Sequence, residues 1–351
     1  MEVTSGNLIF STGGTFDQQY GLLETVTGGN ISITGSTVTL GNITSVGTTS
    51  VTATSGLTLT TSGYNDITID QTHIDADLTN FPVLIKLTDG TGGLNLANTA
   101  ANGSDLRFFA QNGEHLAYEI EGTWSNSPSA TNWVWVKVPS ISGTVNTTLR
   151  MYHGNTGTLT AALATTSVWD SSFKMVQHFE ETSGSATDST TNSYNGTING
   201  VTQNQAGQIG QGVVFDGTTD YITLNKSDIA TDWTFSAWVN RTNSNEPGSL
   251  LMDSASDSLR LEQWSGTDDI GVTKYGVADY RFTPNTEAAI GSWSHIAMVG
   301  SGGTTVTLYV NGSLVEADSV PNIELPMTTI GATAYSLVGS LDEVHASDSA
   351  R

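Results

Sequence analysis

The chain has 351 residues, more than one β-sandwich usually uses, so we expect two or three domains. Hydrophobic residues make up 37% and charged residues 13%, and eight Trp, ten Tyr and ten Phe within alternating patterns exclude uniform disorder. The formal net charge is −23 and no Lys or Arg precedes Lys86, which excludes the basic surface that a nucleic-acid partner requires.

Three absences narrow the class of protein further. The sequence contains no cysteine, which excludes disulfides, thiolate metal sites and cysteine nucleophiles. It contains no apolar stretch of about 18 residues, so we expect no membrane insertion. The first ten residues lack the basic and apolar regions of a signal peptide. We therefore expect that a signal was removed or, preferably, that the protein leaves the cytoplasm in a particle released on lysis.

Residues 1–60 contain a loose alternation of apolar residues separated by Gly, Ser and Thr, which predicts short, half-buried strands. The apolar positions are Ile31, Ile33, Val38, Leu40, Ile43, Val46, Val51, Leu57 and Leu59. These are too few to bury a core, because ordering each residue costs about 1–2 kcal/mol of backbone entropy. We interpret the segment as an attachment or oligomerisation arm; the alternative is a flexible Gly/Thr linker.

Residues 61–160 contain longer strand patterns, which predict a smaller β-sandwich domain. In the run WVWVKV, which starts at Trp133, the valines form one face and Trp, Trp and Lys the other. Five motifs of this block resemble, in order, an uncharacterised β-rich domain of bacterial and phage surface proteins, which often precedes a concanavalin-like domain. They are 73–85 (HIDADLTNFPVLI), 103–108 (GSDLRF), 118–121 (YEIE), 135–139 (WVKVP) and 151–155 (MYHGN). His153 departs from that pattern, where a second Tyr is more common.

Residues 161–351 show period-two strands, for example around Phe235 and Leu308, and an Asn311-Gly312 pair that predicts a type I′ hairpin turn. From residue 168 onward the chain resembles the laminin-G-like and pentraxin-like branch of the concanavalin A-like superfamily, which implies a jelly-roll sandwich. The motifs are 178–181 (HFEE), 188–192 (DSTTN), 195–197 (NGT), 210–217 (GQGVVFDG), 220–222 (DYI), 234–239 (TFSAWV), 293–297 (WSHIA), 308–312 (LYVNG), 330–331 (IG) and 341–344 (LDEV). The predicted fold class is all-β.

We do not expect an enzyme, although concanavalin-like folds include glycoside hydrolases that use two carboxyl groups across a cleft. The motif Glu-x-Asp-x-x-Glu of one large hydrolase group is absent. The acidic pairs that do occur are too close together or face opposite sides of a strand, and the histidines are scattered singly. No zinc-protease, nucleophile-elbow or phosphate-loop motif is present.

The resemblance implies a calcium ion where the Asp-rich loop after the first strand meets the final strand. On the matching positions the ligands are Asp188, Asn192, Asp342 and Glu343. Calcium takes six to eight oxygens, so backbone carbonyls and water complete this set. In the alternative interpretation, Asp188 and Asn192 cap a turn and Asp342 accepts backbone hydrogen bonds.

A ligand surface is predicted between residues 241 and 285, where aromatic residues alternate with carboxylates and amides. The candidates are Trp264, Tyr275, Tyr280 and Arg281, a mixture compatible with a saccharide or a peptide. The alternative is a set of ordinary strands with partly exposed aromatic side chains.

Together these features favour a non-enzymatic virion structural protein, a phage fibre or capsid-decoration subunit, whose distal sandwich contacts a host-cell surface glycan. We expect residues 1–60 to attach to other virion proteins and the protein to form a homo-oligomer, preferably a trimer, on the virion surface. The alternatives are a secreted bacterial adhesin or carbohydrate-binding module, extracellular or on the cell surface, and an accessory domain of a polysaccharide-degrading enzyme. We also expect truncation or cleavage at Arg351.

Overall fold

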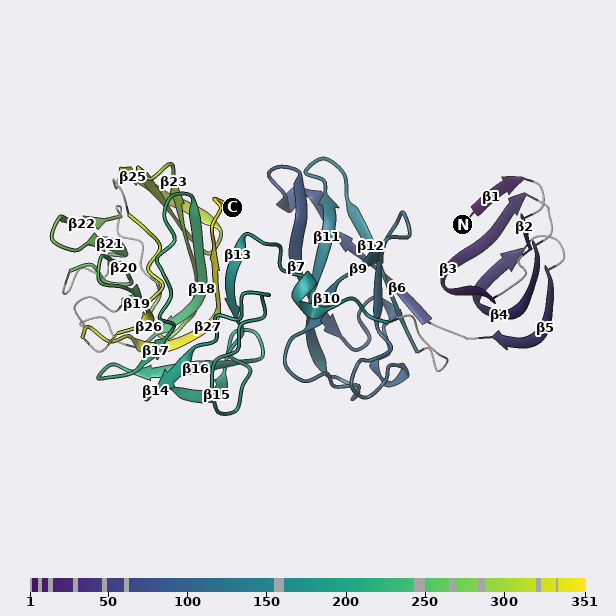
Figure 1. Cartoon of the computed structure of the whole chain (residues 1–351), viewed down its shortest axis with the longest axis horizontal. Helices are drawn as coiled ribbons and strands as arrows, with labels where there is room; N and C mark the ends of the chain where they lie inside the picture. Colours follow the sequence, from purple (N-terminus) through teal and green to yellow (C-terminus); the bar gives the residue numbers. More distant parts are fainter. Residues whose placement is uncertain are drawn as a thin grey trace. The chain divides into compact units, whose positions relative to one another are not determined.

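The structure, a computed structural model, describes residues 2–5, 8–11, 15–27, 31–45, 49–59, 63–154, 161–242, 250–264, 269–282, 288–319, 323–332 and 334–351. Side chains are described from residue 63 onward, except at positions 250 and 319. The chain divides into two compact units, Met1–Val168 and Trp169–Arg351. Both consist of β-sheets (Figure 1), so the predicted all-β fold is confirmed.

The first strands pair with one another in a single parallel sheet. They are β1 (Glu2–Ser5), β2 (Leu8–Ser11), β3 (Thr15–Thr27), β4 (Ile31–Ser45) and β5 (Thr49–Leu59). β4 is central, with β3 and β2 hydrogen-bonded along it and β5 pairing from Ile31↔Thr49 onward. Three of these strands are longer than the short strands predicted, because glycines such as Gly35 lie inside a strand instead of ending it.

The rest of the first unit is a small sandwich of two antiparallel sheets, ordered β10-β11-β7 and β6-β12-β8-β9. Its strands are β6 (Gly63–Ile69), β7 (Leu78–Thr88), β8 (Arg107–Ala110), β9 (His115–Leu116), β10 (Tyr118–Ile120), β11 (Thr131–Ile141) and β12 (Thr147–His153). Four short 3-10 turns are described in this unit: η1 (Gln71–His73), η2 (Thr91–Gly93), η3 (Leu96–Asn98) and η4 (Thr165–Ser167). The predicted alternation in β11 is confirmed, because Val134, Val136 and Val138 are buried in the core.

The second unit is a larger sandwich whose first sheet has the order β15-β16-β27-β18-β23-β24-β25, with β13 also paired to β27. These strands are β13 (Phe173–Gln177), β15 (Thr202–Ala206), β16 (Gln211–Asp216), β18 (Trp233–Arg241), β23 (Trp293–Ser301), β24 (Thr305–Val310), β25 (Ser313–Ser319) and β27 (Val338–Ser347). Asn311 and Gly312 join β24 to β25 with φ of 50° and 77°, which confirms the predicted turn with two left-handed residues.

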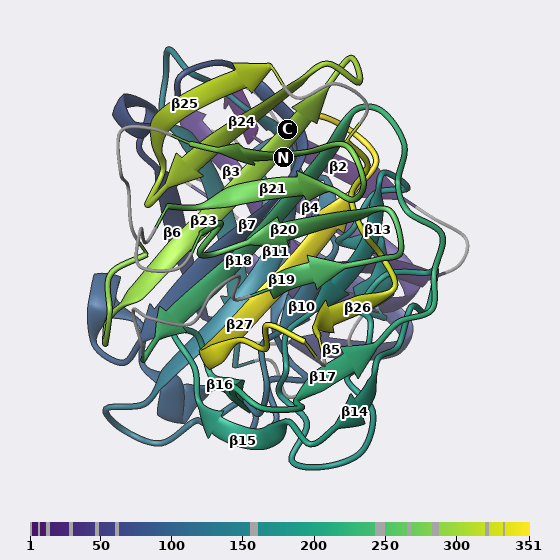
Figure 2. The ribbon, with the colours of Figure 1, turned by 90° about the vertical axis from the view of Figure 1, so that its left-hand side faces the viewer.

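The opposing sheet has the order β14-β17-β26-β19-β20-β21-β22. Its strands are β14 (Thr197–Asn199), β17 (Tyr221–Thr223), β19 (Leu250–Asp253), β20 (Asp257–Arg260), β21 (Gly271–Lys274), β22 (Ala278–Arg281) and β26 (Thr329–Gly331). Figure 2 looks onto strands β19, β20 and β21, with β18, β23 and β27 behind them. One hydrophobic cluster, which includes Phe215, Trp233 and Phe235, fills the space between the sheets.

β27 contains a bulge that shifts the alternation of its side chains. Its pairing with β18 passes from Trp238↔Asp342 to Ser236↔His345, so the β27 strand has one residue more than its partner over this interval. Leu341 and Val344 consequently both face the core although they are three positions apart.

Within the described residues, no helix is long and apolar enough to cross a lipid bilayer.

Candidate functional site

A depression of about 590 Å³ lies over the hairpins β20–β21–β22 of the second unit. Three aromatic side chains are exposed in it: Trp264 by 44%, Tyr275 by 38% and Tyr335 by 56%. Trp264 follows β20, Tyr275 begins the β21–β22 turn, and Tyr335 comes from the loop after β26. The remaining described wall residues are Arg260, Gln263, Thr273, Lys274, Gly276, Val277, Ala278 and Asp279.

Arg260 holds two of these aromatic rings. Its guanidinium carbon lies 5.9 Å from the ring centre of Tyr275 and 5.5 Å from that of Tyr335. Nη2 donates to the Tyr275 hydroxyl at 3.3 Å and Nε donates to Ser258 Oγ at 3.0 Å, while only 8% of the residue is exposed. A nearly buried arginine fixed in this way orients rings that remain open to solvent.

The Tyr275 hydroxyl donates to Asp253 Oδ1 at 2.8 Å. Burial raises the pKa of Tyr275, an effect that its hydrogen bond with Ser258 opposes and the carboxylate of Asp253 increases. Burial also raises the pKa of Asp253, against the lowering effect of the Tyr275 hydrogen bond. Tyr275 therefore remains a neutral hydroxyl at physiological pH, and its hydrogen bonds with Arg260 and Asp253 fix the ring.

A chain of polar groups forms another part of the wall. Gln263 Nε2 donates to Thr273 Oγ1 at 2.7 Å, and Thr273 Oγ1 donates to Asp279 Oδ1 at 2.7 Å. Gln263 Oε1 is buried and has no hydrogen-bond partner among the described residues. Such a pre-set arrangement of donors and acceptors beside aromatic faces is suited to hydroxyl-bearing ligands.

The four predicted ligand-binding residues have different positions. Trp264 and Tyr275 line the depression. Arg281 stacks 4.9 Å from the centre of the Trp264 ring and forms an ion pair with Asp269 at 2.9 Å, so it supports the wall from outside. Tyr280 is half-buried and packs against the hydrophobic core. Sequence reasoning missed Arg260 and Tyr335; the exposed aromatic in the small-residue loop GATAYS was the available signal for Tyr335.

The predicted calcium ligands Asp188 and Asn192 organise the loop after β13. Asp188 Oδ1 accepts hydrogen bonds from the N–H groups of Val176 and Thr190, and Oδ2 accepts from Thr190 Oγ1 and the Tyr194 N–H. Asn192 Nδ2 donates to the carbonyls of residues 173 and 174. These contacts match the turn-capping alternative, and calcium binding at these residues stays a prediction.

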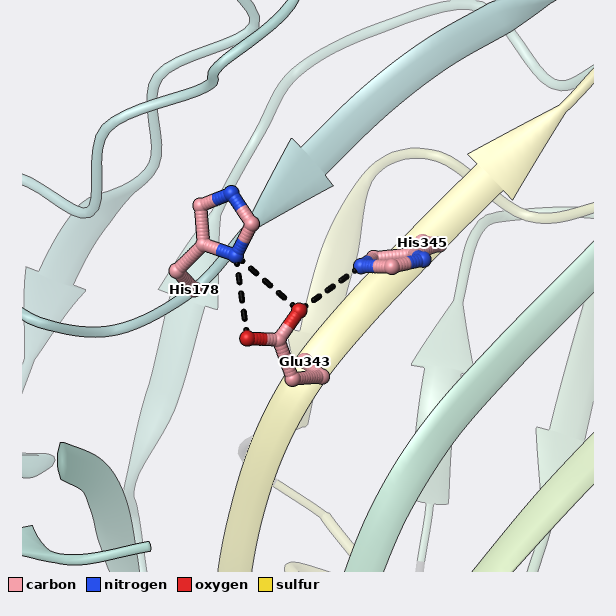
Figure 3. Close-up of side chains that lie close together, drawn as sticks. All are labelled: His178, Glu343 and His345. Atoms are coloured by element: carbon pink, nitrogen blue, oxygen red, sulfur yellow. Dashed lines mark hydrogen bonds and ion pairs between the residues drawn. The ribbon is translucent and has the colours of Figure 1, made fainter. Parts of the chain in front are cut away.

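Asp342 and Glu343 lie where the pairing of β27 changes from β16 to β13. Asp342 Oδ2 accepts the Ile209 N–H at 2.8 Å. The Glu343 carboxylate meets two histidines (Figure 3): His178 Nδ1 lies 2.9 Å and His345 Nε2 lies 2.9 Å from Glu343 Oε2. Sequence reasoning treated both histidines as isolated; only the pairing of β13 with β27 brings them together.

Burial alone would raise the pKa of Glu343, but the positive charge and hydrogen bonds of His178 and His345 reverse this effect and hold the pKa at about 2. The carboxylate is therefore ionised throughout the physiological range.

A second group of closely spaced carboxylates consists of Asp228, Asp257 and Glu324, whose carboxylate oxygens lie within 4.8 Å of one another. Lys274 Nζ lies 3.3 Å from Asp257 Oδ1.

Two stretches of the chain match known sequence families. Residues 216–351 match the concanavalin A-like lectin/glucanase superfamily. Residues 102–199 match a family described as Domain of unknown function (DUF2341). Both resemblances expected from the motifs are thereby confirmed. The match to the uncharacterised family extends beyond the first compact unit and includes His178, whereas the concanavalin-like match includes the whole aromatic depression.

Solved structures similar to this chain include domain 4 of AbnA, an extracellular arabinanase from Geobacillus stearothermophilus, in complex with arabinotriose. It shares 18% identity with a TM-score of 0.42 over 51% of this chain and 93% of its own. The ligand-binding domain of botulinum neurotoxin serotype D with N-acetylneuraminic acid shares 13% identity with a TM-score of 0.39 over 51% of this chain and 48% of its own. The binding domain of Paraclostridial Mosquitocidal Protein 1 shares 18% identity with a TM-score of 0.41, over 51% and 49%. No curated protein matches the chain.

Proposed function

We propose that the concanavalin-like unit is a non-catalytic glycan-binding module and that the aromatic depression is its binding site. The main support is that Trp264, Tyr275 and Tyr335 line one depression, in which Arg260 fixes the rings of Tyr275 and Tyr335. Exposed aromatic rings that cluster in a concave site offer apolar faces to sugar C–H groups, and the adjacent amide, hydroxyl and carboxylate groups bind sugar hydroxyls.

The charge of the depression suggests the class of saccharide. Its described lining contains two cationic side chains, Arg260 and Lys274, and one carboxylate, Asp279, whereas the whole chain has 11 Lys and Arg against 34 Asp and Glu. Lys274 Nζ is paired with Asp257 Oδ1 at 3.3 Å, so Arg260 is the lining cation that would attract a ligand carboxylate in an otherwise acidic protein. We therefore expect saccharides that contain acidic sugars to bind more tightly than their neutral analogues.

The depression offers little support for hydrolysis. Asp279 is the single carboxylate among its described lining residues, and its Oδ1 is already the acceptor for Thr273. Glycoside hydrolases require a pair of carboxyl groups, one acid and one base or nucleophile, on either side of the scissile bond. This arrangement supports binding without turnover.

Titration of the full chain with a panel of neutral and acidic oligosaccharides tests the proposal. Trp264→Ala and Tyr335→Ala should each weaken binding at least roughly tenfold, because aromatic residues that anchor a ligand contribute more than about 1.4 kcal/mol. Tyr64→Ala is the matched control, since Tyr64 is 45% exposed on β6 of the other unit. Absence of saccharide binding, or equal affinity in all three variants, would refute the site.

For the wider role we propose a virion structural protein, with the glycan-binding unit presented to the host surface and the N-terminal strands attached to other virion proteins. Each strand of residues 2–59 pairs in parallel with a strand about one repeat away along the chain, for example Glu2↔Glu24 and Ile31↔Thr49, as the rungs of a β-solenoid do. Such stacked strands suit a stiff attachment arm and an oligomer, for which a trimer is favoured.

Immunogold electron microscopy of the native source, together with the solution mass of the purified chain, distinguishes the candidates. Labelled oligomeric projections on a capsid or tail would support the virion role. Labelling of cell envelopes, or protein free in the medium, would contradict it and support the alternative of a bacterial adhesin or carbohydrate-binding module.

A further inference from the structure

Three side chains with metal-binding atoms converge in the second unit, away from the aromatic depression. His178 follows β13, and Glu343 and His345 lie on β27 (Figure 3). One potential ligand atom from each lies within 4.8 Å of the other two. We propose that His178, Glu343 and His345 bind one divalent transition-metal ion, with zinc as the expected metal. This goes beyond the proposed glycan binding and does not depend on it.

The donor types determine which metal fits. Two imidazole nitrogens and one carboxylate oxygen suit zinc, cobalt, nickel or copper, whereas calcium prefers a shell made of oxygens. The composition of the group therefore disfavours Glu343 as a calcium ligand in company with Asp188. It also distinguishes this group from Asp228, Asp257 and Glu324, which contains oxygen donors only.

The distances are close to those that a metal requires. His178 Nδ1 and His345 Nε2 each lie 2.9 Å from Glu343 Oε2. Zinc binds nitrogen and oxygen at about 2.0–2.2 Å, which places tetrahedral ligands roughly 3.3 Å apart. Each imidazole nitrogen therefore needs to move away from Glu343 Oε2 by a few tenths of an ångström, and the two nitrogens, which lie within 4.8 Å of each other, need to come to roughly the same separation of 3.3 Å.

The backbone places the group rigidly. Glu343 has a φ of 52° within the β27 bulge, and β27 is hydrogen-bonded to β18 on one side and to β13 and β16 on the other. A β-bulge redirects side chains locally and is frequent beside functional sites. Because Glu343 and His345 come from one strand and His178 from another segment, a bound metal would fasten the start of this unit to its final strand.

The surroundings also suit a buried metal. Trp169 is 5% exposed, and its ring centre lies 5.7 Å from that of His178 and 5.3 Å from that of His345. Phe173 is a further neighbour of His345, at 6.3 Å. This aromatic wall limits the access of water and fixes the imidazole planes, as the supporting shell of a metal site does.

The competing interpretation is a hydrogen-bonded ion pair in which each imidazole donates a proton to the carboxylate. Binding of a metal by the same nitrogens requires both protons to leave, so metal affinity should fall as the pH decreases and protons should be released on binding. An ion pair without metal affinity would show neither effect.

The test uses the full chain after treatment with a chelator. Titration with Co²⁺ should produce visible ligand-field absorption bands that saturate at one ion per chain, and Zn²⁺ should displace the Co²⁺ and remove the bands. Zinc should also raise the unfolding temperature, because a ligand that binds only the folded state stabilises it. Ca²⁺ in excess should not displace Co²⁺.

Variants assign the ion to the three residues. His178→Gln and His345→Gln should each weaken Co²⁺ binding at least about 100-fold, more than the loss of a supporting residue causes. His73→Gln, which removes an exposed histidine of the first unit, should have no effect. Circular dichroism verifies that each variant folds. If one does not, the Co²⁺ spectrum and stoichiometry of the wild type still decide whether the chain binds one metal ion. Absence of a saturable band, or an unchanged band in both variants, would overturn the proposal.

Discussion

His295 shows how one half-buried side chain makes the stability of the second unit depend on pH. It lies on β23 with its ring centre 5.2 Å from that of Trp238. Burial lowers the pKa of His295 from 6.5 to about 4, with a further contribution from the charge of His345. Between these two values the unfolded chain binds a proton that the folded chain does not, so the stabilisation is complete above pH 6.5 and is lost as the pH falls toward 4.

We expect the free energy of unfolding of the second unit to decrease by about 2 kcal/mol between pH 7 and pH 4.5 through this residue alone. His295→Gln should remove this part of the pH dependence, as measured by urea unfolding at several pH values in the presence of a chelator. His73→Gln, at an exposed position, serves as the control and should follow the wild type. An identical pH dependence in the wild type and His295→Gln would contradict the assignment.

At the scale of elements, one ion pair crosses the interior of the second unit. Arg241 ends β18 of one sheet, and Glu262 follows β20 of the opposing sheet. Arg241 Nη2 lies 3.1 Å from Glu262 Oε2, and the two side chains are 1% and 0% exposed. A pair buried this deeply contributes little net stability compared with apolar residues, but loss of one partner leaves a buried charge.

Arg241→Met should therefore reduce the free energy of unfolding by about 3–5 kcal/mol, whereas the double variant Arg241→Met, Glu262→Leu should recover most of the loss. Urea unfolding followed by tryptophan fluorescence measures both. Lys174→Met is the control, because its ion pair with Asp348 is partly exposed (27% and 37%) and should contribute about 1 kcal/mol or less. Equal destabilisation by the single and double variants would argue against an uncompensated charge.

Sequence patterns predicted single elements well, because their signals are local. The alternation around Phe235 predicted β18, and Asn311-Gly312 predicted the β24–β25 turn. The sequence patterns did not predict which of the two sheets each strand joins. Phe215 and Tyr221 lie in β16 and β17, which follow each other along the chain but belong to opposite sheets. For the same reason Trp264 and Tyr275 could be predicted from one stretch of sequence, whereas Tyr335 joins them only through the pairing of β26 with β19.

At the scale of the whole molecule, the two compact units have separate hydrophobic clusters. One cluster runs from Ile85 to Met151 and the other from Met175 to Ala346, and each contains residues of one unit only. A cluster that is complete within one stretch of chain can support folding by itself.

We expect a fragment of residues 161–351 to fold alone and to unfold within about 0.5 kcal/mol of the corresponding transition in the full chain. Near-ultraviolet circular dichroism and urea unfolding provide the measurement, and the full chain should show two transitions. A fragment without fixed tertiary structure would show that this unit needs the preceding one in order to fold.

The extra residue in β27 restricts the insertions and deletions that this strand tolerates during evolution. Leu341 and Val344 face the core only because the strand is one residue longer than its partner at this point. A codon deleted between these two residues would leave both side chains facing the core by simple alternation, whereas a codon deleted or inserted elsewhere in the strand would turn the side chains on one side of the change to the opposite face. The number of residues on either side of the bulge within 338–347 should therefore be inherited strictly, while the solvent-facing turn at residues 302–304 should gain and lose codons freely during evolution.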